Sequence, residues 1–147
     1  MSKVETKIDY LYEPSYTSLK KLYDMAFNNL DQILDKEFVL KGWIRFIRAQ
    51  QKTTFIHFYD GSHAKSLQLI FNDQNKKIKD SIEKEANIGA TISIKGLIIK
   101  SPSKGQLIEL IVTSYDLIGP ITESFTYLPC IKKASMEMLR KHQHLRS

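Results

Sequence analysis

The sequence predicts a mainly β protein in which five strands form one sheet and a single helix follows the third strand. Two observations support this prediction. Between Phe38 and Gly119, β-branched and aromatic residues recur in short runs separated by turn residues. Residues 74–88 interrupt these runs, because Ile78 and Ile82 have helical spacing among lysines and glutamates.

Residues 1–37 are predicted to form an N-terminal extension that contains an amphipathic helix. Apolar residues recur at intervals of three and four from Tyr16 to Leu30, and Pro14 and Ser15 precede them as helix start signals. We expect this helix to pack on the strands. The face predicted to make that contact contains Leu19, Leu22 and Phe27.

Residues 38–122 are predicted to form the β domain. Its strands are expected at residues 38–49, 53–60, 65–72, 90–100 and 106–118, with clear turns at 60–62 and 101–105. Three strands, a helix and two more strands is the order of the OB fold, in which the helix covers one open end of the barrel. A sandwich or an SH3-like barrel also has five strands, but neither usually places an amphipathic helix after the third.

Residues 123–147 are predicted to be a hinge. After Pro129 comes a short basic stretch, and a short C-terminal helix is expected from Ser135 to about Lys141. The only cysteine, Cys130, rules out an intrachain disulfide framework and suits a reducing compartment.

Charge favours a polyanionic partner, because the net charge is +6 and the isoelectric point is about 9.3. The positive charge belongs to the barrel and the tail. Residues 1–37 have a net charge of −2, whereas residues 38–128 and 129–147 each have +4. The N-terminus has no arginine and no apolar signal region, and no stretch is long enough to span a membrane. We therefore expect a cytoplasmic protein with no membrane partner.

Strand alternation sorts side chains between the core and the outer face of the barrel. In the second strand Thr54, Ile56 and Phe58 point inward, which leaves Phe55 on the outer face. Parity also places Gln68 on the outer face, and it predicts that Glu109 of the fifth strand is exposed.

The outer wall of the second and third strands is where OB barrels hold oligonucleotides. An exposed Phe55 can stack on a base, and the amide of Gln68 matches the donor and acceptor of a uracil edge. The cations expected to meet phosphates or to stack are Arg45, Arg48, Lys95 and Lys104. An outward aromatic residue is, however, more often only a cross-strand packing partner.

No catalytic residue and no metal site is predicted in this chain. The sequence contains no phosphate-binding glycine loop and no nucleophile elbow. Its four histidines lack the cysteines and organised carboxylates of a metal cluster. Three functions therefore stay open: RNA recognition, sequence-tolerant binding of single strands, and a structural or dimerisation module.

Several motifs resemble those of a known family. They are Val39, Gly42 and Trp43, then Arg45 and Arg48, then Phe55-Ile56, Tyr59-Asp60-Gly61-Ser62 and Leu67-Gln68. This pattern is similar to the anticodon-binding domain shared by the asparaginyl-, aspartyl- and lysyl-tRNA synthetases of class II. Residues 96–109 and 127–146 resemble the asparaginyl branch.

The resemblance implies that Phe55 stacks on the central anticodon uridine, that Gln68 bonds its edge, and that Arg48 and Glu109 help to hold the flanking bases. It implies the asparagine tRNA anticodon loop, tRNA(Asn), as the partner and a homodimer for the whole ligase. ATP and Mg²⁺ would bind in a catalytic domain that would follow Ser147, so no cofactor is expected in this chain.

Overall fold

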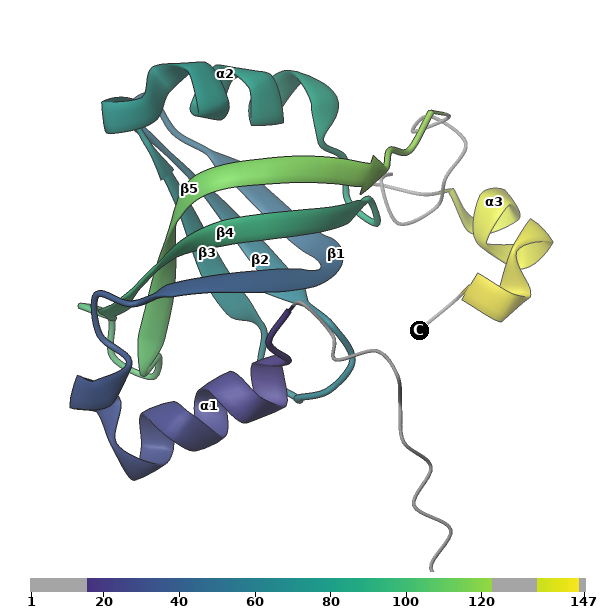
Figure 1. The fold of residues 1–147 in the computed structure, drawn as a ribbon. Helices are drawn as coiled ribbons and strands as arrows, with labels where there is room; N and C mark the ends of the chain where they lie inside the picture. Colours follow the sequence, from purple (N-terminus) through teal and green to yellow (C-terminus); the bar gives the residue numbers. More distant parts are fainter. Residues whose placement is uncertain (1–15, 123–134, 146–147) are drawn as a thin grey trace, which may run out of the picture.

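The computed structural model describes residues 16–122 and 135–145, and five strands form a closed barrel within them (Figure 1). The strands are β1 (Glu37–Ala49), β2 (Thr53–Tyr59), β3 (Leu67–Asn72), β4 (Thr91–Lys100) and β5 (Ile108–Gly119). Their order around the barrel is β1-β2-β3-β5-β4, and β4 pairs with β1 to close it. Only β3 and β5 pair in parallel. The predicted OB-type barrel is confirmed.

Strand β1 pairs with two neighbouring strands, β4 and β2, because it bends. Its first half pairs with β4 up to Trp43, and its second half pairs with β2 from Trp43 onward. The register with β2 shifts between Ile44 and Phe46, so Arg45 is the extra residue of a bulge. Gly42 allows the bend: a Cβ there would lie 2.4 Å from the carbonyl oxygen of Tyr59.

The predicted alternation of buried and outward residues is confirmed in β2, β3 and β4. The inward side chains of β2, Thr54, Ile56 and Phe58, are fully buried. The other strands contribute the same kind of core residue, including Leu67, Leu69, Ile92, Ile94, Ile98, Ile108, Leu110 and Val112.

The helix predicted between β3 and β4 covers one end of the barrel (Figure 1). A short 3₁₀ turn, η2 (Asp73–Asn75), leads into α2 (Lys76–Glu85). Thr54 Oγ1 donates a hydrogen bond to Glu83, and the Lys79 amine lies 3.1 Å from the same carboxylate. Both contacts lower the pKa of Glu83, and the hydrogen bond from Thr54 joins α2 to the barrel interior.

Helix α1 (Leu19–Asn28) and the turn η1 (Leu30–Gln32) cover the opposite end of the barrel (Figure 1). Leu19 and Leu22 are fully buried, as predicted, but Phe27 is 87% exposed. The prediction for Phe27 was wrong because the buried stripe is centred on Leu22 and Ala26, and Phe27 lies roughly 100° further around the helix than Ala26.

The N-terminus of α1 begins at a different signal from the one expected. Ser18 is the cap, and its Oγ accepts a hydrogen bond from the backbone N–H of Lys21. The expected start signals Pro14 and Ser15 lie outside the described residues.

The C-terminal helix α3 (Met136–Lys141) begins after its cap Ser135 and is followed by the turn η4 (Gln143–Leu145), which confirms the predicted helix. Pro129 and Cys130 lie outside the described residues. Within residues 16–122 and 135–145, no helix is long and apolar enough to cross a membrane.

Candidate nucleic-acid interface

Four strands place polar and aromatic side chains in one row on the outer face of the barrel. Arg48 of β1 is paired in register with Phe55 of β2. One step along, His57 pairs with Gln68 of β3, and Gln68 pairs with Glu109 of β5. The barrel register therefore brings together residues that are up to 61 positions apart in the sequence.

These residues line one open cavity of about 360 Å³. Four predicted site residues, Arg48, Phe55, Gln68 and Glu109, are among its walls. Phe55 is partly buried, so one part of its ring is packed and another faces the cavity. The cavity is within the ~300–1,000 Å³ range of small-ligand sites, which is large enough for a flat base.

The carbonyl oxygen of Gln68 contacts the loop between β4 and β5. Gln106 Nε2 of that loop donates a hydrogen bond to Gln68 Oε1 at 3.2 Å. This contact favours one orientation of the Gln68 amide, and the oxygen keeps a second lone pair for another donor. The two amides thus separate the cavity from the space beyond the loop.

Glu109 is buried, which corrects the prediction that it is exposed. Parity placed it on the correct side of β5, since it lines the cavity, but only 2% of its surface is exposed. The loop between β4 and β5 folds over it, and Ser101 Oγ donates a hydrogen bond to Glu109 Oε1 at 2.7 Å. Loop coverage of this kind is not encoded in strand alternation.

Arg48 is held at the turn between β1 and β2. The turn is closed by the backbone N–H of Gln50, which donates to the Thr53 carbonyl at 3.0 Å. With the Gln50 amide oriented so that its oxygen faces the guanidinium, it accepts from Arg48 Nε at 3.3 Å and from Nη2 at 3.2 Å. The guanidinium therefore stays beside Phe55 at the rim of the cavity.

Sequence reasoning missed four residues that line the cavity: Gln50, His57, Pro102 and Ser103. His57 shares the outward parity of Phe55, and that signal was available. Its ring meets the edge of Phe46 at a centroid distance of 5.8 Å, and Phe46 is 50% exposed. The other three lie in loops, whose positions periodicity cannot predict.

Three of the predicted cations do not line the cavity. Arg45 lies over the ring of Tyr59, with its guanidinium carbon 5.7 Å from the centroid. Lys95 of β4 forms an ion pair with Glu37 at 2.9 Å. Lys104 is exposed in the β4–β5 loop, directly after Ser103, which does line the cavity.

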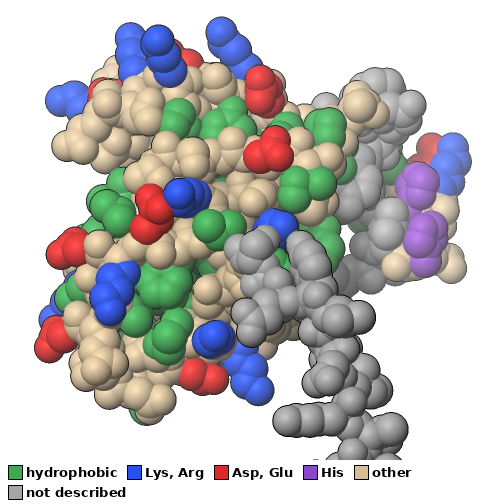
Figure 2. All heavy atoms as spheres, viewed as in Figure 1, with side chains coloured by type: hydrophobic (Ala, Val, Ile, Leu, Met, Phe, Trp, Pro, Cys, Tyr) green, Lys and Arg blue, Asp and Glu red, His purple; other side chains and the backbone are tan. Residues whose placement is uncertain are grey.

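Figure 2 views the barrel with β4 and β5 in front of β2 and β3. Acidic and basic side chains are interspersed on this face, and lysines and arginines gather over α2 at the top. A mixed-charge face of this kind does not by itself attract a polyanion as a uniformly basic face does.

Among the described residues, no group of three or more His, Cys, Asp or Glu side chains is placed to hold a metal ion.

Residues 38–118 match a family described as an OB-fold nucleic acid binding domain and named for the tRNA anticodon. Among curated relatives, the asparagine–tRNA ligase of Borrelia garinii is 37% identical over 114 residues, which are 78% of this chain and 24% of the relative. The asparagine–tRNA ligase of Blochmanniella floridana is 40% identical over 120 residues, which are 81% of this chain and 25% of the relative. The chain thus spans about a quarter of the length of these curated relatives.

Solved structures agree on the fold. Asparaginyl-tRNA synthetase from Pyrococcus horikoshii, complexed with asparaginyl-adenylate, aligns with a TM-score of 0.64 at 15% identity. The alignment covers 90% of this chain and 29% of the synthetase chain. The Entamoeba histolytica asparaginyl-tRNA synthetase has a TM-score of 0.58 at 21% identity, covering 76% of this chain and 27% of its own. At these identities the likeness shows the shared barrel alone.

Proposed function

The chain belongs to the tRNA anticodon family of OB-fold nucleic acid binding domains, and from this membership we propose that its outer cavity binds the anticodon loop of asparagine tRNA. Residues 38–122 would be the binding domain, and residues 123–147 would be the hinge. The arrangement of Arg48, Phe55, Gln68 and Glu109 around one cavity is the observation that supports the proposal most directly. The asparagine–tRNA ligases among the relatives favour this function over a sequence-tolerant single-strand binder.

In this proposal the central uridine of the anticodon stacks on Phe55. Stacking of a base on an aromatic side chain contributes about 1–3 kcal/mol and accepts any base. Base choice then depends on the Gln68 amide, whose oxygen accepts from N3–H of uracil and whose N–H donates to O4. A cytosine edge presents its donor and acceptor in the reverse order, so an amide held in one orientation by Gln106 binds only one of the two pyrimidines.

The remaining walls would act on the backbone and the flanking bases. The Arg48 guanidinium at the rim would meet a phosphate or stack on a flanking base. The buried Glu109 carboxylate accepts from Ser101 and would accept from a base amino group at the floor of the cavity. Lys104 would approach the backbone from the β4–β5 loop.

The whole protein would be an asparagine–tRNA ligase of the cytoplasm that works as a homodimer. Its ATP and Mg²⁺ would bind to residues other than those of this domain, which would position the tRNA and leave the chemistry to a catalytic domain. The net charge of +6 suits an RNA partner but does not select one.

The experiment is a titration of this chain with anticodon stem-loops of asparagine tRNA that carry either uridine or cytidine at the central position. We expect cytidine to weaken binding about tenfold or more, and Phe55→Ala to weaken binding of the uridine form by a similar factor. Ile118→Ala is the control, because Ile118 is an apolar residue on the outer face (54% exposed) that lies at the end of β5 farthest from the β4–β5 loop.

Equal affinity for both RNAs, together with unchanged binding by Phe55→Ala, would exclude base recognition by this cavity. Equal binding of unrelated single strands, with a steep dependence on salt, would instead indicate a sequence-tolerant binder.

A further inference from the structure

A second cavity lies beside the first, between α1 and the two loops that follow β2 and β4. Its volume is about 510 Å³. Gln106 lines this second cavity and donates to Gln68, which lines the first, so the Gln68–Gln106 hydrogen bond is a shared wall. Ser66, directly before β3, lines the second cavity, and Gln68, two positions later on β3, lines the first.

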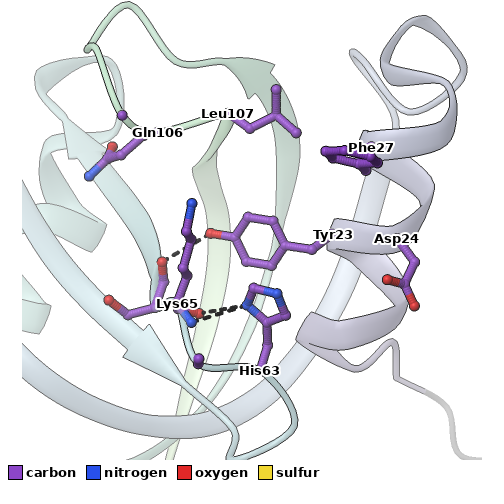
Figure 3. A pocket seen from close by; sticks show the side chains of 10 residues that line it. Tyr23, Asp24, Phe27, His63, Lys65, Gln106 and Leu107 are labelled. Carbon is purple, nitrogen blue, oxygen red and sulfur yellow. Dashed lines mark hydrogen bonds between the residues drawn. The ribbon is translucent and has the colours of Figure 1, made fainter.

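Two exposed apolar side chains, Phe27 and Leu107, are among the walls of this second cavity. Phe27 of α1 is 87% exposed, and Leu107, directly before β5, is 38% exposed. Figure 3 shows the two side chains directed toward each other across the opening. An exposed phenylalanine opposite an exposed leucine leaves a slot with two apolar sides, and a flat ring would remove both side chains from water.

The floor of the slot is already ordered. The ring of Tyr23 stacks on the ring of His63 with centroids 4.4 Å apart, and the Tyr23 hydroxyl donates to the Ser66 carbonyl at 3.0 Å. Burial raises the pKa of this hydroxyl, which keeps it protonated as a donor. Because helix α1 is fixed to the loop in this way, Phe27 is presented from a rigid element and needs little ordering to bind.

Charge around the slot suits a nucleotide. Lys65 lies on one side of Tyr23 and Asp24 lies on the opposite side (Figure 3). A phosphate is therefore favoured at the Lys65 side, where Figure 3 also places Gln106. Gln106 donates to Gln68, which lines the first cavity. The Gln106 amide at the same edge can donate to or accept from a base.

We infer that this slot holds a second nucleotide of the same RNA loop, with its base between Phe27 and Leu107 and its phosphate at Lys65. The inference rests on the proposed function, since it places a neighbour of the nucleotide that stacks on Phe55. It goes beyond the matched family segment, because Phe27 lies outside residues 38–118. The barrel thus grips two bases, and α1 supplies half of the second site.

The test is a double-mutant cycle between the protein and the RNA. The anticodon stem-loop of asparagine tRNA is prepared intact and with a single abasic nucleotide at each loop position in turn. Dissociation constants are measured at one salt concentration for the wild-type chain, Phe27→Ala and Phe55→Ala. Phe27→Leu and Phe27→Trp accompany them, because leucine keeps an apolar side chain without a ring and tryptophan keeps a ring.

We expect Phe27→Ala and Phe27→Leu to bind the intact loop about 5- to 100-fold more weakly, and Phe27→Trp to bind it as the wild type does. At one loop position other than the central uridine, loss of the base weakens the wild type by a similar factor and no longer weakens Phe27→Ala. Loss of the central uridine base still weakens Phe27→Ala but not Phe55→Ala. Log affinity falls linearly with log salt concentration, and Lys65→Gln makes this slope shallower by about 0.7. Lys84→Gln on α2 leaves the slope unchanged.

Wild-type affinity in Phe27→Ala overturns the second site. So does an abasic scan in which loss of the base weakens binding to Phe27→Ala and to the wild type equally at every loop position. The same holds for full affinity in Phe27→Leu or an unchanged salt slope in Lys65→Gln. In each of these cases a persisting effect of Phe55→Ala leaves the proposed function intact. Failure of the wild-type chain to bind any of the RNAs overturns both.

Discussion

Asp60 links the loop after β2 to the first turn of α1. Its Oδ2 accepts from the backbone N–H of Leu19 at 2.8 Å, and its Oδ1 accepts from the backbone and side chain of Ser62. Ser62 Oγ in turn accepts from the Lys20 N–H at 3.0 Å. Together with the Ser18 cap, these contacts satisfy three of the helix donors that otherwise lack a partner.

Replacing Asp60 tests this cap through its dependence on pH. Partial burial pushes the pKa of Asp60 upward, but the hydrogen bonds from Ser62 and Leu19 outweigh it and hold the pKa below its ordinary value of 3.8. The carboxylate therefore stabilises the fold above pH ~4, and this contribution is lost as the pH falls through the lowered pKa. We expect Asp60→Asn to lower the free energy of unfolding by about 0.3–1 kcal/mol at neutral pH.

Urea unfolding at several pH values measures this effect. The difference between the wild type and Asp60→Asn should shrink as the pH falls below 3.8, because Asp60 is then increasingly protonated. Asp116→Asn is the control, since Asp116 is exposed on β5 and caps no helix. A difference that stays constant with pH would show that the charge on Asp60 does not support α1.

Single residues illustrate which features of the site can be predicted from the sequence and which cannot. Alternation predicted that Phe55, Gln68 and Glu109 share the outer wall, because strand periodicity is local. The burial of Glu109 depends on Ser101 and on the path of the β4–β5 loop, which no period encodes. The sequence predicts a turn at Asp60 and Ser62, whereas their role as a cap arises only when α1 folds against them.

At the scale of elements, β1 is the piece that closes the barrel. It reaches β4 on one side and β2 on the other, so its backbone must approach β2 closely at the bend. A Cβ on Gly42 would lie 2.4 Å from the Tyr59 carbonyl oxygen and 2.7 Å from the ring of Phe58. Neither neighbour can move easily, because one is strand backbone and the other is fully buried.

Gly42→Ala is therefore expected to lower the free energy of unfolding by about 1–3 kcal/mol, as overpacking of a filled interior does. Gly119→Ala is the matched control: its Cβ would lie 3.2 Å from the Thr91 hydroxyl, a contact that a small side-chain shift relieves. Thermal unfolding followed by far-UV circular dichroism compares the two variants. Equal melting temperatures for both would mean that the β1–β2 contact is looser than the structure indicates.

The type and order of the helices and strands were predictable from the sequence. Which face of each helix packs on the barrel was less predictable. Five strands and the helix after β3 follow from periods of two and about three and a half, which the sequence displays directly. The buried face of α1 was misjudged at Phe27, since a ten-residue helix with apolar residues on more than half of its surface offers two possible faces. The barrel end that it covers decides between them.

At the scale of the whole molecule, the N-terminal helix belongs to the barrel. Leu19, Leu22 and Ala26 form one continuous core with the strand residues, although the matched family segment begins only at residue 38. The division at residue 37 that sequence composition suggests is therefore not a boundary of packing. Both open ends of the barrel are covered, one by α1 and the other by α2 (Figure 1).

Two substitutions on opposite sides of α1 test this unity and also serve the second-site proposal. Leu22→Ala removes a fully buried side chain at the covered end of the barrel and should lower the free energy of unfolding by about 2–4 kcal/mol. Phe27→Ala, on the exposed side of the same helix, should change it by less than about 0.5 kcal/mol. Urea unfolding can be followed by the fluorescence of Trp43, the only tryptophan, which lies on β1 rather than on α1.

If α1 unfolded independently of the barrel, Leu22→Ala would leave the Trp43 transition unchanged and alter only the helical signal. A coincident shift of both signals is expected, because a single core implies one cooperative transition. An unchanged transition in Phe27→Ala has a further consequence. Any loss of RNA affinity in that variant then comes from the exposed ring itself, since the helix that carries it is still held in place by Leu19 and Leu22.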